Sequence, residues 1–287
     1  VGSEMCIRDR REAAAQADVA VVFAGLPGQA ESEGFDRDHM RLPEGHLRMI
    51  DAAAGANPNT VVVLLSGGVV ECPWADRVRG ILYMGLPGQA GGEAVADLLY
   101  GRVNPSGRLA ESWPYRYEDV PSAEIYDRTT DALYQEGLYV GYRYYDKAGV
   151  PVRWPFGYGL SYTTFAYADL RVTGDTATVT VQNTGRVAGA EVVQLYLRTP
   201  QDGLHRPVLE LKGFQKVFLQ PGERMTVTFR LDDRCFAVWQ DGWKVPAGEY
   251  TACVGGLTAA LLKTGETLPV PDWQAGSWYE RCEGRPN

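Results

Sequence analysis

The 287-residue sequence is poor in the residues and motifs on which several kinds of catalysis depend. It has only three histidines, His39, His46 and His205, and they are widely spread. It contains no H-E-x-x-H, no G-x-x-x-x-G-K-[ST] and no G-x-G-x-x-G motif. Ser66 in "LLSGG" lacks the first glycine of a G-x-S-x-G nucleophile turn. A zinc site, a nucleotide site and a Ser-His-Asp triad are therefore poorly supported.

Long apolar runs and strong positive charge are also missing. Apolar runs such as residues 60–65 are far too short to cross a bilayer, and no run of Lys and Arg exceeds two residues. The chain carries 36 acidic and 28 basic residues, a net charge of −8 at pH 7. These features argue against nucleic acid and anionic membranes as partners.

Cysteines are few, and their spacing shows neither a C-x-x-C pair nor a metal-binding pattern. The five are Cys6, Cys72, Cys235, Cys253 and Cys282. An odd, scattered set of this kind favours free thiols in a reducing compartment, which points to the cytoplasm. We expect no metal and no cofactor.

The first ten residues, "VGSEMCIRDR", show no helical or strand periodicity and do not begin with methionine. Periodic sequence starts directly afterwards, at "REAAAQADVAVVF". We interpret residues 1–10 as a non-native or artefactual leader and exclude them from the predicted fold.

Residues 11–115 alternate between patterns typical of strands and of helices. The apolar runs "VAVVFAG", "TVVVLLSGG" and "GILYMG" predict strands, the first of them buried on both faces. Pro43 can open a helix that Gly55 closes, and "GGEAVADLLYG" predicts another helix. This alternation predicts an α/β sandwich domain, with helices flanking a mostly parallel sheet.

The hexapeptide "GLPGQA" occurs twice, at residues 25–30 and 85–90, each time after a predicted strand. Loops beyond the carboxyl ends of the strands carry the ligand site in open α/β sheets. We therefore expect both loops, and the acidic segment after the first, to lie at one functional edge.

The remainder of the chain has a different pattern. Residues 116–158 are rich in turns and tyrosine and predict a long ordered linker. Over residues 159–265 the apolar period becomes two, as at Val193 and Leu195, which predicts an antiparallel β-sandwich. The polar residues 266–287 predict a tail or a truncated connection.

The segment "AESEGFDR" places Glu31, Glu33 and Asp36 directly after the first strand. A carboxyl group at a sheet edge can be partly desolvated when another domain covers it, and its raised pKa then lets it donate a proton near neutral pH. An ordinary solvated loop is the alternative, because charges usually stay exposed. We expect Arg37 to pair with Asp36 or Glu31.

Four stretches together resemble the C-terminal half of glycoside hydrolase family 3. They are "ESEGFDR…LPEGHLRMIDAAAGANPNTVVVLLSGGVVECPWAD", "YMGLPGQAGGEAVADLLYGRVNPSGRLAESWP", "YVGYRYYD" and "FGYGLSYTTF". The likeness extends from about residue 11 to 265. It implies an α/β sandwich domain followed by a fibronectin type III-like domain, in agreement with the periodicities.

The resemblance also implies chemistry. It gives Glu33 the role of general acid/base in a retaining β-glycosidase, with β-glucosidase as the leading activity and a β-glucoside or short oligosaccharide as substrate. The nucleophilic aspartate of such enzymes lies on a (β/α)₈ barrel, whose aspartate motif this sequence lacks. The barrel would precede or follow these domains, and the chain alone is predicted to be inactive.

Two alternatives remain at this point. One is a β-xylosidase of the same family, and the other is a non-catalytic module that binds sugar or a partner.

The other family motifs have structural interpretations. "NPSG" at 104–107 predicts a turn. We expect "GYRYYD" and "FGYGLSY" to pack the linker against the sandwich, with a role for Tyr142 or Tyr145 near a substrate entrance as the alternative. Trp74 is predicted as a core or interface residue rather than a sugar platform. His39 is predicted to lie on a surface loop.

Overall fold

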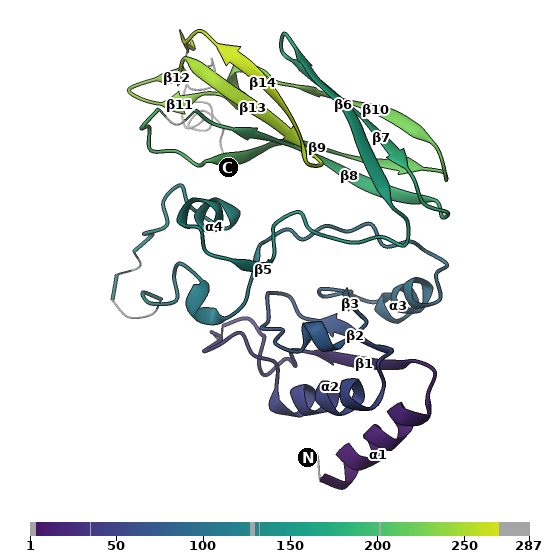
Figure 1. Cartoon of the computed structure of the whole chain (residues 1–287). Coiled ribbons are helices and arrows are strands. Elements are labelled where there is room, and N and C mark those ends of the chain that lie inside the picture. The colour runs from purple at the N-terminus through teal and green to yellow at the C-terminus, as the bar shows by residue number, and fades with distance from the viewer. Residues whose placement is uncertain (1–3, 35, 127–129, 132, 201, 270–287) are drawn as a thin grey trace, which may run out of the picture. The chain divides into compact units, whose positions relative to one another are not determined.

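The computed structural model describes residues 4–34, 36–126, 130–131, 133–200 and 202–269. The chain forms two units, one built around parallel strands and one built of antiparallel strands (Figure 1). Unit 1 comprises Val1–Val103, Leu109–Gly137 and Ala148–Tyr158. Unit 2 comprises Asn104–Arg108, Leu138–Lys147 and Gly159–Asn287. The segment expected to be a linker, residues 116–158, is thus shared between the units.

Unit 1 contains a three-stranded parallel sheet in the order β1-β2-β3. Its strands are β1 (Ala20–Gly25), β2 (Thr60–Leu65) and β3 (Gly80–Tyr83). Val62 is the central register position, opposite Val22 on one side and Ile81 on the other. The predicted parallel sheet is confirmed.

Three helices of unit 1 accompany this sheet, and of these α2 packs directly on β1 and β2. They are α1 (Glu4–Gln16), α2 (Glu44–Ala56) and α3 (Gly91–Leu99), and α1 packs on α2, which in turn packs on β1. The helix predicted to open with Pro43 begins one residue later, at Glu44, and it continues through Gly55 to Ala56. It ends there because Asn57 is extended, and its N–H donates to the carbonyl of Ala53.

Helix α1 begins at Glu4, so it includes residues for which we predicted no regular structure. The segment 4–10 contains neither glycine nor proline, and a helix nucleated in "REAAAQ" propagates through such residues at little cost. Arg8 and Glu12 form an i,i+4 ion pair at 3.3 Å. The non-native origin of residues 1–10 stays a prediction.

The expectation that β1 is buried on both faces is wrong for the described part of the chain. Val22 and Ala24 are buried against α1 and α2, whereas Val21 and Phe23 are 41% and 50% exposed. Successive side chains of a strand point to opposite faces, and the two helices cover only the face of Val22.

Trp113 ties the later part of unit 1 to its core. It lies on β4 (Trp113–Pro114), which pairs with β5 (Val152–Trp154), and it is 1% exposed. Its indole N–H donates to the carbonyl of Val70 at 2.6 Å, and its ring packs edge-on against Tyr83 at 5.0 Å between centroids. The 3₁₀ turns η1 (Ala75–Arg77) and η2 (Tyr117–Asp119) complete the unit.

Unit 2 is an antiparallel sandwich of sheets ordered β10-β7-β6 and β14-β13-β8-β9, with a small third sheet β11-β12-β15. Its elements are α4 (Tyr142–Ala148, whose last residue belongs to unit 1), β6 (Phe165–Thr173), β7 (Thr176–Asn183), β8 (Gly189–Arg198), β9 (Leu209–Leu219), β10 (Arg224–Arg230), η3 (Asp233–Cys235), β11 (Val238–Trp239), β12 (Trp243–Val245), β13 (Gly248–Val254), β14 (Leu257–Lys263) and β15 (Glu266–Thr267).

The predicted period of two is confirmed in the sandwich core. Val193, Leu195 and Leu197 point inward from β8 and are at most 1% exposed. Val179 of β7 lies opposite Val227 of β10, and both are buried in the same core. Alternation places one apolar row of each strand between the sheets.

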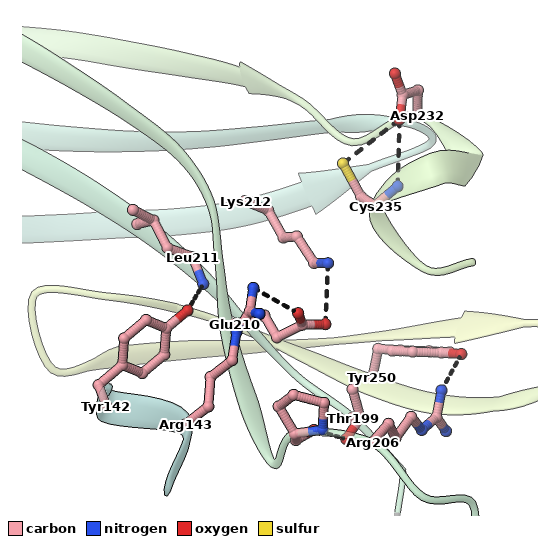
Figure 2. A network of polar contacts seen from close by, with 11 residues as sticks. Tyr142, Arg143, Thr199, Arg206, Glu210, Leu211, Lys212, Asp232, Cys235 and Tyr250 are labelled. Atoms are coloured by element: carbon pink, nitrogen blue, oxygen red, sulfur yellow. Dashed lines mark hydrogen bonds and ion pairs between the residues drawn. The ribbon is translucent and has the colours of Figure 1, made fainter. Parts of the chain in front are cut away.

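Polar contacts attach α4 to strand β9 within unit 2 (Figure 2). The N–H of Leu211 donates to the Tyr142 hydroxyl at 2.9 Å. Glu210 binds Arg143 and Lys212, each with 3.1 Å between nitrogen and carboxylate oxygen. These contacts make the piece 138–147 part of the sandwich.

The motif "NPSG" is not the turn predicted for it, because residues 104–107 form neither a turn nor a bend. The Asn104 amide donates to the carbonyl of Ala188 at 3.1 Å, and its oxygen accepts from the Ser161 hydroxyl at 2.8 Å. The same oxygen accepts from the N–H of Tyr162. Asn104 thereby fixes the piece 104–108 to the segments that directly precede β6 and β8.

Candidate active-site loop

The acidic segment predicted to carry chemistry leaves the carboxyl end of β1. Because β1, β2 and β3 are parallel, the loops after them emerge at the same edge of the sheet. Both copies of "GLPGQA", at 25–30 and 85–90, lie at this edge, which confirms the prediction that they share it. Such edges carry the ligand sites of open α/β sheets.

Gly25 lets the chain turn off the end of β1 close to β2. A Cβ atom at this position would lie 2.0 Å from the carbonyl oxygen of Leu65, so only glycine fits. The N–H of Leu26 donates to that same oxygen at 2.9 Å. Nδ1 of His46, in the first turn of α2, lies 2.9 Å from the carbonyl oxygen of Gly25. Sequence reasoning missed this histidine, because nothing in its neighbourhood marks a partner 21 residues away.

Glu33 is exposed, and so are its neighbours Ser32 and Gly34. Gly34 has a φ of +81°, in the left-handed region that glycine adopts readily, so the chain reverses directly after Glu33. The Glu33 carboxyl group therefore lies on a turn at the edge of unit 1 where the parallel strands end.

Glu31 is held by the segment that follows β2. One of its carboxylate oxygens accepts from the N–H of Gly67 at 2.8 Å, and the other accepts from the N–H of Gly68 at 3.1 Å. Hydrogen bonds of this kind, to an ionised acceptor, are shorter and stronger than neutral ones. Glu31 thus has a defined structural role that the sequence did not reveal.

Arg37 does not pair with Asp36 or Glu31, so that expectation is wrong. Its guanidinium donates to the carbonyl oxygen of Val69 at 3.1 Å. Both oxygens of Glu31 already accept backbone amides, and Asp36 accepts from the Tyr126 hydroxyl at 2.6 Å. The carboxylates are therefore engaged elsewhere. The Nη2 atom of Arg37 is buried and has no hydrogen-bond partner in the described part of the chain.

These contacts define what we call the acidic loop, residues 31–34, 36 and 37. The loop is attached near both ends to one short stretch, residues 67–69, through Glu31 and Arg37. That stretch is itself well fixed. Ser66 just before it is fully buried, and its hydroxyl donates to the carbonyl of Gly68 at 2.8 Å.

Two more titratable groups surround this stretch. The Tyr83 hydroxyl donates to the carbonyl of Ser66 at 3.1 Å, and burial, helped by the charges of Glu111 and Glu31, raises the pKa of Tyr83. Desolvation of its carboxyl raises the pKa of Glu111, although that residue as a whole is exposed, and the Arg37 guanidinium opposes the rise. Sequence reasoning missed Glu111, which lies about 80 residues from the acidic loop along the chain.

The other residues singled out from the sequence have structural surroundings. Trp74 is 2% exposed in the core of unit 1, which confirms its prediction as a core residue. Tyr145 is buried, and Tyr142 packs edge-on against Tyr196 at 6.2 Å between centroids. Their alternative role near a substrate entrance stays a prediction. His39 is exposed, as predicted.

No group of three or more His, Cys, Asp or Glu side chains is arranged to hold a metal ion in the residues that the structure describes. Cys72, Cys235 and Cys253 are free thiols there, while the side chains of Cys6 and Cys282 lie outside the described set. Within the same residues, no helix has the length and apolar character needed to cross a membrane.

Comparison with protein families accounts for both units. The Glycosyl hydrolase family 3 C-terminal domain matches residues 4–142, and the Fibronectin type III-like domain matches residues 191–258. The chain therefore carries a family 3 glycosyl hydrolase C-terminal domain followed by a fibronectin type III-like domain, as the sequence motifs implied.

Among curated proteins, the chain is 49% identical over 264 residues to thermostable beta-glucosidase B of Acetivibrio thermocellus, covering 88% of this chain and 35% of that protein. It is 46% identical over 286 residues to an exo-alpha-(1->6)-L-arabinopyranosidase of Bifidobacterium breve, covering 93% and 38%. The chain thus spans about a third of the length of the curated relatives it matches.

Solved structures agree with this assignment. The family 3 beta-glucosidase of Bifidobacterium adolescentis matches with a TM-score of 0.88 and 42% identity, over 98% of this chain and 44% of that one. The beta-glucosidase of Kluyveromyces marxianus in complex with glucose matches with a TM-score of 0.88 and 39% identity, over 93% and 34%. The chain is therefore homologous to family 3 glycoside hydrolases and is β-glucosidase-like.

Proposed function

We propose that this chain is the C-terminal portion of a retaining β-glucosidase and that Glu33 is its general acid/base. The observation that carries the proposal is the setting of Glu33. It is an exposed carboxyl group on a turn at the carboxyl edge of a parallel sheet, within a family 3 C-terminal domain. The resemblance of "EGFDR" to the family's acid/base segment supports the same residue.

The mechanism assigns two roles to this one carboxyl group. Glu33, protonated, donates its proton to the glycosidic oxygen as the bond from that oxygen to the anomeric carbon breaks. A nucleophilic aspartate, ~5 Å from Glu33, attacks the anomeric carbon and forms a covalent glycosyl-enzyme. Glu33, now ionised, then takes a proton from a water molecule that attacks the anomeric carbon, and the bond from that carbon to the aspartate breaks, so both carboxyl groups return to their starting states.

We place the nucleophile on a (β/α)₈ barrel of the same polypeptide, outside this chain. The chain spans about a third of its curated relatives, which leaves room for such a domain in the whole protein. The exposure of Glu33 supports this arrangement, because nothing in the described part of the chain covers the carboxyl group that would face the barrel.

The sugar is assigned from the relatives. Several named beta-glucosidases support a terminal β-D-glucosyl residue, and four of the matched structures are glucose complexes. The arabinopyranosidase of Bifidobacterium breve supports a second candidate, a terminal arabinopyranosyl residue. Aryl glucosides, arabinopyranosides and xylosides tested side by side on the whole protein discriminate these sugars from the β-xylosidase alternative. A non-catalytic module would hydrolyse none of them.

The acid/base role is tested with Glu33→Ala in a polypeptide that joins this chain to its barrel. For substrates with poor leaving groups, which need the proton most, kcat/KM should fall by about 10²–10⁴-fold. Substrates with activated leaving groups should lose much less. Added azide should raise kcat by attacking the glycosyl-enzyme without base assistance. The assignment of Glu33 fails if its variant keeps wild-type rates while Glu31→Ala shows this whole pattern.

A further inference from the structure

We propose that Glu31 is a positioning residue for Glu33, and that its bond to the amides of Gly67 and Gly68 sets where the acid/base carboxyl group stands. The inference rests on the proposed function of Glu33 and goes beyond it, because Glu31 itself touches no reacting atom.

The first support is the geometry of the Glu31 carboxylate. Its two oxygens accept from two successive backbone amides, at 2.8 Å and 3.1 Å. A carboxylate with one bond can pivot about it, whereas two bonds fix its orientation as well as its position. The side chain of Glu31 is therefore an anchor with a defined direction, 36 residues from Gly67 along the chain.

The second support is the rigidity of the anchoring point. Ser66 is fully buried, its hydroxyl binds the carbonyl of Gly68, and its own carbonyl accepts from Tyr83. The next two residues after the glycines, Val69 and Val70, belong to the buried core. The Glu31 carboxylate can hold the acidic loop in place only if Gly67 and Gly68 do not move, and these contacts connect them to the sheet.

The third support is distance along the chain. Glu33 follows Glu31 by two residues, so their Cα atoms are at most about 7 Å apart. Release of Glu31 would leave the acidic loop held at its far end, by Arg37 on Val69 and by Asp36 on the Tyr126 hydroxyl, with no side-chain anchor near Glu33 in the described part of the chain. Catalytic groups tolerate little displacement, since an error of about 1 Å can reduce a rate by about 10²-fold.

The two glycines supply a matched pair of probes that leave Glu31 itself unchanged. A Cβ atom on Gly67 would lie 3.0 Å from Oε1 of Glu31 and 3.2 Å from its Cδ, so the carboxylate would have to shift. A Cβ atom on Gly68 would lie 3.9 Å from the same oxygen, which is ordinary contact. The Gly68 Cβ would also lie 3.5 Å from Nη1 of Arg37, again an ordinary contact, so Gly67→Ala should disturb the anchor more than Gly68→Ala.

The experiment measures kcat/KM for two aryl β-glucosides, one with a good and one with a poor leaving group, in the polypeptide that includes the barrel. The variants are Glu31→Ala, Glu31→Gln, Gly67→Ala and Gly68→Ala. Glu33→Ala is the reference, and Glu44→Gln, in the exposed first turn of α2, is the control. The value of kcat/KM reports the step that needs the acid, so general loss of folded enzyme lowers it equally for both substrates.

Glu31→Ala should lower kcat/KM by about 10–10²-fold for the poor leaving group and by much less for the good one. Glu31→Gln, which keeps one acceptor oxygen, and Gly67→Ala should show the same selectivity with smaller losses. Glu44→Gln should match the wild type, and Gly68→Ala should lose less than Gly67→Ala. In the chain itself, Glu31→Ala should speed hydrogen exchange at the amides of residues 67 and 68.

The positioning role is overturned if Glu31→Ala lowers kcat/KM equally for both substrates, or does not lower it, while Glu33→Ala still shows leaving-group selectivity and azide rescue. Wild-type behaviour of Gly67→Ala together with a selective defect in Gly68→Ala would contradict the geometry. If Glu33→Ala itself lacks leaving-group selectivity and azide rescue, the proposed function fails instead. The two failures are thus distinguishable.

Discussion

Arg108 and Glu191 form a buried ion pair in unit 2, with side chains only 11% and 10% exposed. The second oxygen of Glu191 accepts from the Tyr167 hydroxyl at 2.7 Å, so both carboxylate oxygens are engaged. Burial and the Glu191 charge raise the pKa of Tyr167, which keeps its hydroxyl a donor at alkaline pH. The pair joins the short piece 104–108 to β8.

Removing one partner of this pair should therefore be costly. Arg108→Met leaves Glu191 buried without its cation and should lower the free energy of unfolding by about 3–5 kcal/mol. Arg230→Met is the matched control, because Arg230 and Asp175 are 80% and 60% exposed and 3.6 Å apart. That change should cost less than about 1 kcal/mol. Urea unfolding of the chain measures both, and equal effects would contradict the buried pair's importance.

The thiol of Cys72 should make the chain less stable at alkaline pH. Burial raises the pKa of Cys72 from 9.0 to about 12. Between these values the unfolded thiol loses its proton while the folded one keeps it, so the unfolded state gains relative stability as pH rises. The contribution of the buried thiol to the stability of the folded state is fully present below pH 9 and is lost progressively up to about pH 12.

The comparison with Cys72→Ala isolates that contribution. The free energy of unfolding should fall more steeply with rising pH in the wild type than in Cys72→Ala. The difference between the two slopes should correspond to one proton, on the order of 1 kcal/mol per pH unit. Slopes are compared rather than absolute stabilities, since the change to alanine also alters packing. Parallel slopes from pH 9 to 11 would show that the thiol titrates normally in the fold.

Deletion of residues 1–10 should be tolerated, whereas deletion of residues 1–17 should not. The first removes the start of α1, whose residues 8–10 are exposed, and should shift Tm by less than about 2 °C. The second also removes buried Ala14 and the carbonyls of Ala14 and Ala17, which accept from the Asn57 amide at 2.9 Å and 2.7 Å. Thermal unfolding followed by circular dichroism measures both shifts. A large fall after the shorter deletion would make residues 1–10 part of the fold.

The chain alone should have no glycosidase activity, because the nucleophilic carboxylate is proposed to lie outside it. Release of nitrophenol from an aryl β-glucoside should stay far below a typical enzyme turnover of ~10 s⁻¹. A Glu33→Ala preparation purified in the same way is the control. Turnover within ~100-fold of that value in the wild-type chain but not in the control would require a nucleophilic carboxylate within this chain.

Local periodicity was sufficient to predict the parallel sheet, the sandwich and the shared edge of the two "GLPGQA" loops. These features depend on side-chain spacing, which the sequence displays directly. The burial of Trp74 was also predictable, but from the type of side chain, since a large aromatic side chain is most often buried.

The predictions failed where a contact joins distant segments. Arg37 and Glu31 were expected to bind nearby opposite charges, but their partners are backbone groups of Gly67, Gly68 and Val69. Every residue has such groups, so the sequence carries no sign of which ones are used. The prediction that β1 is buried on both faces failed for a related reason. An apolar run shows that both faces of a strand are suited to burial, but it does not show which segment covers each face.

The way the chain divides between its units has a consequence for anyone who wishes to separate them. Unit 2 is assembled from three stretches, 104–108, 138–147 and 159–287, and the intervening stretches belong to unit 1. A gene cut at residue 158 would yield a sandwich without Asn104, Arg108 and Arg143, and hence with Glu191 buried and its cation lost. No single cut keeps all three stretches of unit 2 together and separate from unit 1, so the two units should be produced as one polypeptide.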